Sequence, residues 1–458
     1  MDYVGPIAAC LFIVVAGRSL LKGRYPHAVL LLSGLAMMAL ALALGYRLPP
    51  LSEPTGASFF DFFRYIEDSF AGTLAGVGLM IMAIGGFVAY MDDIGASQAL
   101  VRIATRPLKW FSKYPYATTS MLIPIGQLLF VTIPSAAGLG LLLMASVYPL
   151  IIRLGVSRLS AVSVIVACTS FGIGPASAIT VRAAAILDVP VVDFFSSGQI
   201  PLVIPASLVM AVAFFFVNRI ADRKLPEERR EELAQDDADA QEKAPAYYAI
   251  FPVLPLLMLL LLSGVFSVLP VPLELDTTTA MIATTAIAAA VHALRVRDVG
   301  RSLSSLKIFW KGMADIFATV VTLIIAADIF AKGLISLDLI GGLLRIASGL
   351  GLGAVGVGIL MSVMIFLATI LMGSGNASFF AFGPLAPKIA SGLGANPEGL
   401  ILPMQLSSSM GRSVSPIAGV VIATAEIAKV PPMAVARRNF IPLGVALVTV
   451  LVVQYAFR

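Results

Sequence analysis

The chain has 458 residues, of which 59% are hydrophobic and 12% charged, with a formal net charge of +5 and a mean hydropathy of +0.96. Soluble domains carry about 25% charged residues, so the composition excludes an ordinary soluble protein and indicates several membrane spans. The apolar runs do not alternate with polar residues, which excludes an outer-membrane barrel and predicts an all-α polytopic bundle. The basic residues gather at the ends of these runs, so the positive charge does not indicate nucleic-acid binding.

Long apolar runs predict full spans, because a helix needs about 20 residues to cross roughly 30 Å of hydrocarbon. These runs cover residues 4–17, 27–45, 72–91, 199–218, 247–269, 278–294, 313–333 and 440–457. Segments 94–112 and 336–349 are more polar, and we expect amphipathic helices along opposite membrane surfaces there. Residues 219–246 are strongly hydrophilic and predict a charged cytoplasmic linker near the middle of the chain.

The charges of the connecting segments predict the orientation. Arg18, Lys22 and Arg24 lie in a loop without acidic residues, whereas the segment with Glu53 and Asp68 is net acidic. Residues 293–311 and the pair Arg437-Arg438 form further basic segments. The positive-inside rule puts the basic segments in the cytoplasm, so both termini are expected outside.

An internal repeat relates the two halves of the chain. The tripeptide "RIA" at 102–104 returns at 345–347, an offset of 243 residues. Ser135 and Ser374 match at an offset of 239, and further matches follow in the same order. Under the predicted orientation the matching spans cross the membrane in opposite directions. Inverted repeats of this kind are typical of secondary transporters, whose site lies at the membrane midplane where broken helices meet.

Polar interruptions occur at matching places in both halves. The expected hairpins pair 115–133 with 136–153 around the tip "TIPSAAG", and 351–372 with 377–393 around the tip "MGSGNAS". The expected broken spans pair 158–168 with 176–187 around "TSFGIGP", and 398–409 with 416–428 around "MGRSVSP". We therefore expect about ten spans plus two re-entrant hairpins.

Unpaired backbone at membrane depth is tolerated only where it is buried in protein or lines a water-filled cavity. Glycine and proline open the helix, and the nearby serine, threonine and asparagine side chains supply hydroxyl and amide groups. Half-helix N-termini suit an anion, and free carbonyl groups suit a cation. The four interruptions therefore predict one substrate site.

The chain resembles the DcuC type of anaerobic C4-dicarboxylate transporters, in the ion transporter superfamily, over nearly its full length. The telling stretches are "GLMIMAIGGFVAYMDDIGA", "KGMADIFATVVTLIIAADIFAKGL", "GSGNASFFAF" and "SMGRSVSPIAGVVIATAEIAKVPP". The resemblance implies a carrier of succinate, fumarate or malate in the bacterial inner membrane. It also implies a homodimeric elevator that works as an antiporter or with Na⁺ or H⁺, and no other cofactor. The chain departs from the family pattern at Ser177-Ala178-Ile179 and Arg182.

All the polar interruptions fall in two parts of the chain, residues 115–218 and 351–458. We expect these parts to pack as one mobile transport domain. Residues 1–114 and 247–350 are then expected to form the scaffold and the dimer contact.

Arg412 is the strongest candidate for substrate contact, because a charge at membrane depth is costly and a guanidinium can bind a carboxylate through two parallel hydrogen bonds. The alternative is structural pairing with Asp315 or Glu426. Arg182 has two interpretations, contact with the second carboxylate or extension to the outer surface. Asp315 and Asp328 are expected in structural or interface roles rather than in a proton relay.

The remaining site candidates are polar or small residues at the hairpin tips and helix breaks. Each is a weak signal, because a serine in a membrane helix often bonds only to its own backbone. They are Ser135, Thr169, Ser170, Ser374, Gly375, Asn376, Ser408, Ser409 and Ser413. A coupling cation is expected near Ser135 and Asn376.

Other functions fit the sequence less well than a dicarboxylate carrier. A carrier of another organic acid or of an amino-acid conjugate is the nearest alternative. An intramembrane enzyme is disfavoured, because the two histidines, His27 and His292, lie near span ends and no HExxH motif or paired catalytic carboxylates occur. A passive channel is disfavoured because inverted repeats with paired hairpins favour alternating access.

Overall fold

The computed structural model describes residues 4–22, 24–51, 53–111, 113–223, 244–262, 275–297, 299–349 and 352–457. Within these ranges the regular structure is helical and contains no strand, as predicted. The greater part of the predicted linker, residues 224–243, lies outside the described residues.

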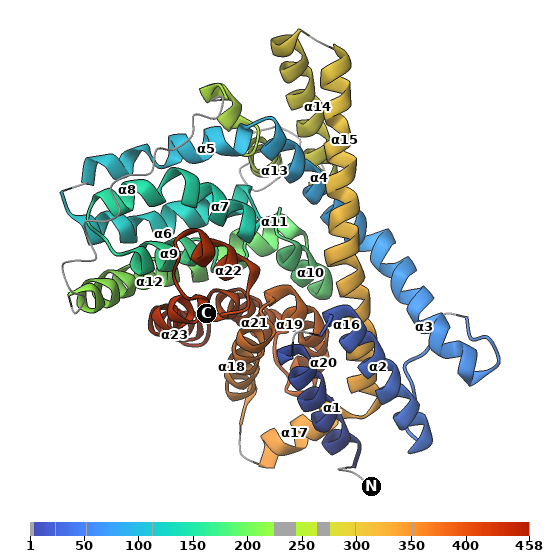
Figure 1. Cartoon of the computed structure of the whole chain (residues 1–458). Coiled ribbons are helices and arrows are strands. Elements are labelled where there is room, and N and C mark those ends of the chain that lie inside the picture. Colours follow the sequence, from blue (N-terminus) through green and yellow to red (C-terminus); the bar gives the residue numbers. More distant parts are fainter. Residues whose placement is uncertain are drawn as a thin grey trace.

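Figure 1 shows the arrangement of the helices. The first half contains α1 (Val4–Leu21), α2 (Pro26–Ala43), α3 (Ser58–Thr73), η1 (Leu74–Gly78), α4 (Leu79–Asp93), α5 (Ala96–Ala104), η2 (Arg106–Phe111), α6 (Pro115–Thr132), α7 (Ala136–Ser146), α8 (Tyr148–Arg153), α9 (Arg158–Ala167), α10 (Ala178–Leu187), α11 (Val191–Asp193), η3 (Phe194–Gln199) and α12 (Ile200–Asp222). The second half contains η6 (Ala246–Ile250), α13 (Leu254–Leu262), α14 (Thr277–Val296), α15 (Val299–Ile316), η7 (Phe317–Val321), α16 (Thr322–Ser336), α17 (Leu339–Gly349), α18 (Ala354–Met372), α19 (Gly375–Phe382), η8 (Gly383–Leu385), α20 (Ala386–Gly392), α21 (Glu398–Val414), α22 (Gly419–Ile427) and α23 (Pro432–Ala456).

Several helices extend beyond their apolar runs. One helix runs without interruption through α3, η1 and α4, and a second through α15, η7 and α16. The apolar runs 72–91 and 313–333 thus lie inside longer helices, and much of the connecting sequence beside them is helical. The physical reason is that backbone hydrogen bonding continues into polar turns, whereas the apolar run marks only the part suited to hydrocarbon.

The two halves carry the same succession of elements. The π-helical turn η1 begins at Leu74 and η7 begins at Phe317, 243 residues later, and α5 and α17 keep this offset. Helices α6 and α18, and then α7 and α19, begin 239 residues apart. In Figure 1 the long helix through α3 and α4 rises from the lower right, whereas the helix through α15 and α16 descends from the top. The two long helices thus run in opposite directions.

The bounds of the hairpins and broken helices differ from the prediction in three places. The second arm of the first hairpin is interrupted at Val147, and the second arm of the other hairpin is divided into α19, η8 and α20. Helix α21 continues to Val414, so the break after it covers residues 415–418 rather than 410–416. The described part of the segment 247–269 is also not one helix, because the turn residues 251–253 separate η6 from α13. Residues 263–269 lie outside the described residues.

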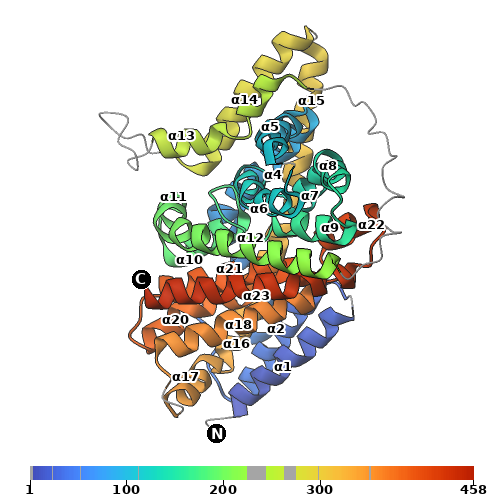
Figure 2. The same ribbon diagram turned by 90° about the vertical axis from the view of Figure 1, so that its left-hand side faces the viewer.

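One buried ion pair joins helices that are far apart in the sequence. Asp222 at the end of α12 accepts hydrogen bonds from Arg438 Nη1 of α23 at 3.2 Å and from Ser160 Oγ of α9 at 2.9 Å. Ser157 Oγ and Tyr116 OH also donate to this carboxylate, at 2.9 and 3.3 Å. The packing of α12 along α23 is visible in Figure 2. This cluster fixes α6, α9, α12 and α23 to one another.

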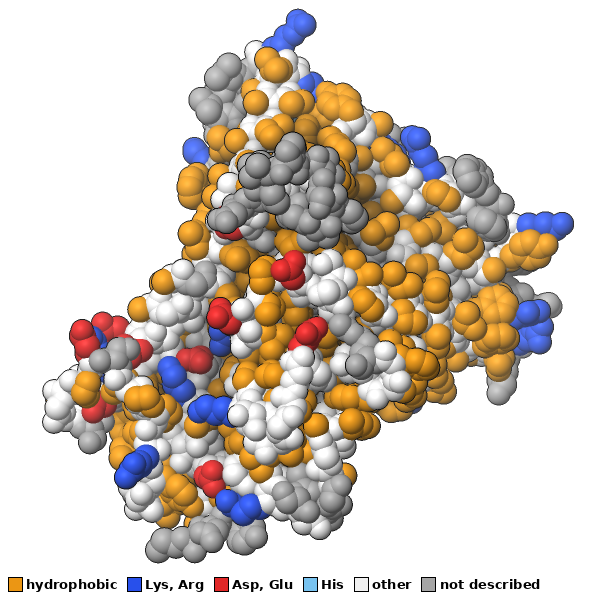
Figure 3. Space-filling model, turned by 180° about the vertical axis from the view of Figure 1, so that it is seen from behind, with side chains coloured by type: hydrophobic (Ala, Val, Ile, Leu, Met, Phe, Trp, Pro, Cys, Tyr) orange, Lys and Arg blue, Asp and Glu red, His pale blue; other side chains and the backbone are white. Residues whose placement is uncertain are grey.

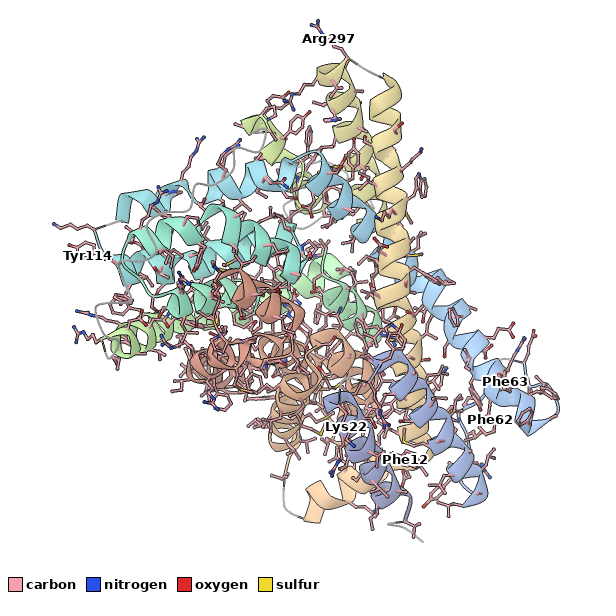
Figure 4. The ribbon with its side chains drawn as sticks, viewed as in Figure 1. Phe12, Lys22, Phe62, Phe63, Tyr114 and Arg297 are labelled. Carbon is pink, nitrogen blue, oxygen red and sulfur yellow. The ribbon has the colours of Figure 1, made fainter. Side chains whose placement is uncertain are left out.

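Six of the described helices are long and apolar enough to cross a membrane, and α4 with α5, bent by 77°, would make a seventh. Figure 3 shows hydrophobic side chains over much of one face, with Lys and Arg side chains projecting at its top and right-hand edge. Figure 4 places Arg297, in the turn before α15, at the opposite end of the molecule from Phe62 and Phe63 of α3. Lys22 of the first basic segment lies in the lower half of the same view, well below Arg297. The orientation across the membrane stays a prediction.

Candidate substrate site

The break between α9 and α10, residues 168–177, is surrounded by buried amide side chains. The Gln405 side chain of α21 donates to the Gly172 carbonyl, and Gln199 Oε1 accepts from the Gly174 N–H at 3.1 Å. Gln199 Nε2 also donates to Gln405 Oε1 at 3.0 Å. These bonds replace the helical bonds that the open backbone lacks. The two glutamines thus stabilise an open turn in the protein interior.

Arg412 lies in the last turn of α21 and extends toward this break. Its Nη2 donates to the Thr169 carbonyl, and the guanidinium carbon lies 5.5 Å from the centre of the Phe130 ring at the end of α6. No carboxylate of the described residues forms an ion pair with Arg412, so neither Asp315 nor Glu426 is its partner. Arg412 is half-buried as a residue, and its Nε is buried without a hydrogen-bond partner in the described chain. Arg412 therefore retains capacity to bind an anion.

Hydroxyl groups without partners occur in the break between α9 and α10 and in or next to α21. The side-chain oxygens of Ser170, Ser407 and Ser415 are buried and make no hydrogen bond to the residues that the structure describes. An unsatisfied buried polar group costs about 1–3 kcal/mol, so such groups are expected only where water or a ligand satisfies them. By contrast, Thr169 Oγ1 donates to the Val166 carbonyl of α9 at 2.9 Å, and Ser408 Oγ donates to the Gln405 carbonyl of its own helix at 2.7 Å.

The break and α21 approach each other closely, together with the second hairpin tip. A Cβ atom on Gly172 would lie 2.7 Å from Ser409 Oγ, and one on Gly375 would lie 2.7 Å from the Ser408 carbonyl. The contact at Gly375 is with backbone and therefore requires glycine, whereas a side chain at position 172 would require the Ser409 hydroxyl group to move. Ser413 Oγ completes the junction with a 3.5 Å bond to the Val166 carbonyl.

The second hairpin tip is a helix start. Ser374 is the N-cap of α19 and accepts a hydrogen bond from the Ala377 N–H at 3.2 Å. Asn376 lies in the first turn, half-buried, and its amide makes no hydrogen bond with the described residues. The N-terminus of α19 thus presents free N–H groups and an amide beside Ser408.

The first hairpin tip has the same construction but other neighbours. Ser135 caps α7 and accepts from the Gly138 N–H at 3.1 Å, as expected from its match with Ser374. A Cβ atom on Gly138 would lie 4.0 Å from Asp92 Oδ2 at the end of α4. Among the described residues no hydrogen bond joins Ser135 to Arg412, and the structure brings the first tip to the end of α4 instead.

Arg182 on α10 faces α16. Its Nη2 lies 3.9 Å from Asp328 Oδ1, and Asp328 Oδ2 lies 2.9 Å from Lys332 Nζ. Ser69 Oγ of α3 also donates to Asp328 Oδ2 at 2.7 Å. Asp328 therefore has a structural partner, whereas contact between Arg182 and substrate stays a prediction. Asp315 is exposed, and its backbone carbonyl accepts a bond from Thr319.

Three residues that surround the first break were not among those predicted for the site: Gln199, Gln405 and Thr180. Thr180 Oγ1 donates to the Gly172 carbonyl at 3.0 Å and accepts from Gln199 at 3.0 Å. A glutamine inside an apolar run is a usable signal, since "PMQLSSS" and "SSGQIP" each place one next to serines. The missing information is the pairing, because Gln199 and Gln405 are 206 residues apart.

Comparison with known families and proteins gives a consistent result. Residues 5–456 match the family model described as "DcuC: C4-dicarboxylate anaerobic carrier". The chain is 33% identical to the anaerobic C4-dicarboxylate transporter DcuC of Escherichia coli K12, over 99% of this chain and 96% of that protein. It is 36% identical to the probable anaerobic C4-dicarboxylate transporter DcuC of Vibrio cholerae, over 95% of this chain and 94% of that protein.

Two solved structures share the fold. MtrF of Neisseria gonorrhoeae, from a class of antimetabolite efflux pumps, aligns with a TM-score of 0.60 over 93% of this chain and 94% of its own, at 15% identity. The YdaH transporter of Alcanivorax borkumensis aligns with a TM-score of 0.55 over 94% and 98%, also at 15% identity. At this identity the likeness concerns the fold alone.

Proposed function

Since the chain belongs to the DcuC family of C4-dicarboxylate anaerobic carriers, we propose that it transports succinate, fumarate and malate across the bacterial inner membrane as a secondary active transporter. The family consists of transporters, so the chain is a membrane carrier and not an enzyme. The substrate is a small dianion, and a site for it requires positive charge and hydrogen-bond donors inside the membrane.

The observation that carries this proposal is the incomplete bonding of Arg412. The guanidinium contributes one bond to Thr169 and keeps Nε free, beside the unpartnered hydroxyl groups of Ser170 and Ser415. A carboxylate supplies the counter-charge that the described protein lacks at this point, and it binds a guanidinium through two parallel bonds. The N-terminus of α19, with Ser374 and Asn376, adds donors from the second hairpin tip. Ser409 and Ser413 complete this side of the site.

The proposed mechanism is an elevator, in which a transport domain moves against a static scaffold. The Asp222 cluster favours one rigid transport body, because it ties α6, α9 and α12 to α23. Helices α4 and α16 pack instead against α15 and α2, which supports a separate scaffold. The transport body comprises residues 115–218 and 351–458, and the scaffold comprises residues 1–114 and 247–350. The scaffold also forms the homodimer contact.

The coupling is proposed to be antiport or symport with Na⁺ or H⁺. The candidate cation position lies at the hairpin tips near Ser135 and Asn376, where short helices begin. Both termini are assigned to the periplasm, because the basic segments at 18–24 and 293–311 then face the cytoplasm.

Uptake of radiolabelled succinate into proteoliposomes tests the function. A Na⁺ gradient, a pH gradient and internal dicarboxylate are supplied one at a time. We expect succinate to accumulate against its own concentration gradient under one of these conditions, and that condition identifies the coupling. Equilibration without accumulation under every gradient would assign a channel. Accumulation of another organic acid without competition by succinate would assign the other substrate class.

A reversible cross-link tests the elevator. Cysteines at positions 182 and 328, in a variant with Cys10 replaced by Ser, are joined by a cleavable bis-thiosulfonate reagent. We expect transport to stop on cross-linking and to return on reduction, with each single cysteine variant unaffected by the reagent. Undiminished uptake by the fully cross-linked protein would contradict the proposed relative motion.

A further inference from the structure

A deep apolar crevice lies away from the proposed substrate site, between α1, α2, α16, α18 and α19. Its volume is about 580 Å³. Val14, Leu367 and Leu371 form its exposed rim, with 63%, 49% and 44% of their surface accessible. Leu30 and Phe330 are buried residues of its floor. The crevice therefore opens on an apolar outer surface and reaches the protein interior.

The crevice is closed to charged or strongly polar ligands along most of its length. Among the described residues that line it, Arg18 alone carries a charge. Burying a polar group without a partner is costly, whereas a hydrocarbon chain gains about 0.8 kcal/mol for each buried CH₂ group. Its occupant must therefore be a flexible apolar chain.

A basic cluster lies at one end of the crevice. Arg18 is in the last turn of α1, and Lys22 and Arg24 follow in the turn to α2. All three are exposed, and none forms an ion pair with a residue that the structure describes. Lys22 is visible at the end of α1 in Figure 4. No Asp or Glu occurs between residues 3 and 52, so the positive charge is not compensated locally.

We propose that the crevice binds an anionic phospholipid, with an acyl chain between α1 and α18 and the phosphate group against Arg18, Lys22 and Arg24. The combination of an apolar slot with a cationic end matches the two parts of such a lipid. Met372 lines the same crevice next to Gly373 of the second hairpin tip, so the bound chain contacts that hairpin. The lipid site requires only a membrane protein and does not depend on the proposed substrate.

Gly17 provides a direct test, because it lines the crevice and a Cβ atom on it would meet no atom within 4 Å. Gly17→Phe fills the slot and also removes a helix-weakening glycine from α1. Gly444→Phe is the matched control, since a Cβ atom on Gly444 of α23 likewise meets nothing within 4 Å. Each purified protein is delipidated, and binding of phosphatidylglycerol and of phosphatidylcholine with identical acyl chains is counted by native mass spectrometry.

We expect the original protein and Gly444→Phe to bind phosphatidylglycerol in preference to phosphatidylcholine, and Gly17→Phe to lose this lipid. Arg18→Gln should weaken phosphatidylglycerol binding by about fivefold while leaving phosphatidylcholine unchanged. Arg153→Gln, at the end of α8, is the control for loss of an exposed arginine. Size-exclusion profiles verify that every variant is folded, and Gly17→Leu replaces Gly17→Phe if the larger side chain prevents folding.

Equal phosphatidylglycerol binding by Gly17→Phe and the original protein overturns the proposal. Equal binding of the two lipids, with no effect of Arg18→Gln, overturns it as well. Dissociation of a dimer by Gly17→Phe without loss of lipid would assign the crevice to a second copy of the chain. Because bound lipid is counted without transport, failure of this proposal is distinguishable from failure of succinate uptake.

Discussion

Two largely buried arginines, Arg438 and Arg412, differ in their bonding partners. Arg438 donates to Asp222, Ser160 and Asn218, and the side chains of Arg438 and Asp222 are only 11% and 2% exposed. Arg412 bonds to one backbone carbonyl, faces the Phe130 ring and has no carboxylate partner among the described residues. The charge of Arg438 is paired with a carboxylate within the protein, whereas the charge of Arg412 is not paired with any described carboxylate.

The difference separates a structural charge from a charge available to a ligand. A buried charge without a counter-charge is expensive, so a protein that contains one is less stable than it could be. Such a group is expected where a ligand supplies the missing charge. The region around Asp222 therefore holds helices together, and the region around Arg412 is available for binding.

Mutation of the Asp222–Arg438 ion pair should have the largest effect on stability. Asp222→Asn removes the counter-charge of Arg438 and leaves a buried cation, which we expect to cost about 3–5 kcal/mol of stability. Thermal unfolding in detergent, followed by size-exclusion chromatography, measures the loss.

Asp315→Asn is the matched control for Asp222→Asn, because Asp315 is exposed and should tolerate the change. The double variant Asp222→Asn, Arg438→Gln should recover part of the lost stability, since no uncompensated charge remains. Unchanged unfolding of Asp222→Asn would show that the two regions do not differ as described.

Mutation of Arg412 should have the opposite effect, with loss of transport and no loss of stability. Arg412→Ala is expected to abolish succinate transport while the unfolding temperature is maintained, because it removes a charge that the protein does not neutralise. Arg412→Lys keeps the charge but loses the two-pronged geometry, so the affinity should fall by roughly tenfold or more. Proteoliposome uptake and succinate binding measure these effects. Normal succinate transport by Arg412→Ala would remove Arg412 from the site.

Part of this site was predictable from the sequence because local rules govern it. Ser135 and Ser374 were identified as hairpin tips, and both are N-caps, since serine before a helix satisfies a free N–H group. The first arm of the second broken span was predicted to end at Ser409, whereas α21 continues to Val414. Glycine is tolerated in a helix, whereas Pro416 disfavours helical geometry only at the residue before it, Ser415.

Other features depend on contacts that no local pattern encodes. Asp222 and Arg438 are 216 residues apart, and the sequence analysis assigned Asp222 to a hydrophilic linker. The hydropathy there is dominated by the charged residues that follow, so the last turn of α12 was merged with them. Only the packing of α12 against α9 and α23 distinguishes Asp222 from the other acidic residues.

Arg182 is the intermediate case, with one carboxylate at 3.9 Å that it shares with Lys332. We expect the contact with Asp328 to be its role, so Arg182→Gln should leave the affinities for succinate and butyrate nearly unchanged while slowing transport. If Arg182 instead binds the second carboxylate, the variant should lose about 1.5–3 kcal/mol of succinate binding, roughly ten- to a hundredfold, and keep its butyrate affinity. Binding of both acids to the purified variant distinguishes the roles.

The smallest expected effects come from removing one serine hydroxyl group near Arg412 and one near Asp222. Ser170→Ala removes a buried hydroxyl group that has no partner in the described protein, so the unfolding temperature should be maintained or should rise. Succinate affinity should fall by the value of one hydrogen bond, about 0.5–1.5 kcal/mol, or roughly two- to tenfold. Ser160→Ala removes a hydroxyl group that bonds to Asp222 and Arg438, so it should lower the unfolding temperature and leave succinate affinity unchanged. If both variants lose stability and neither loses affinity, Ser170 is structural and the site is confined to Arg412 and the second hairpin tip.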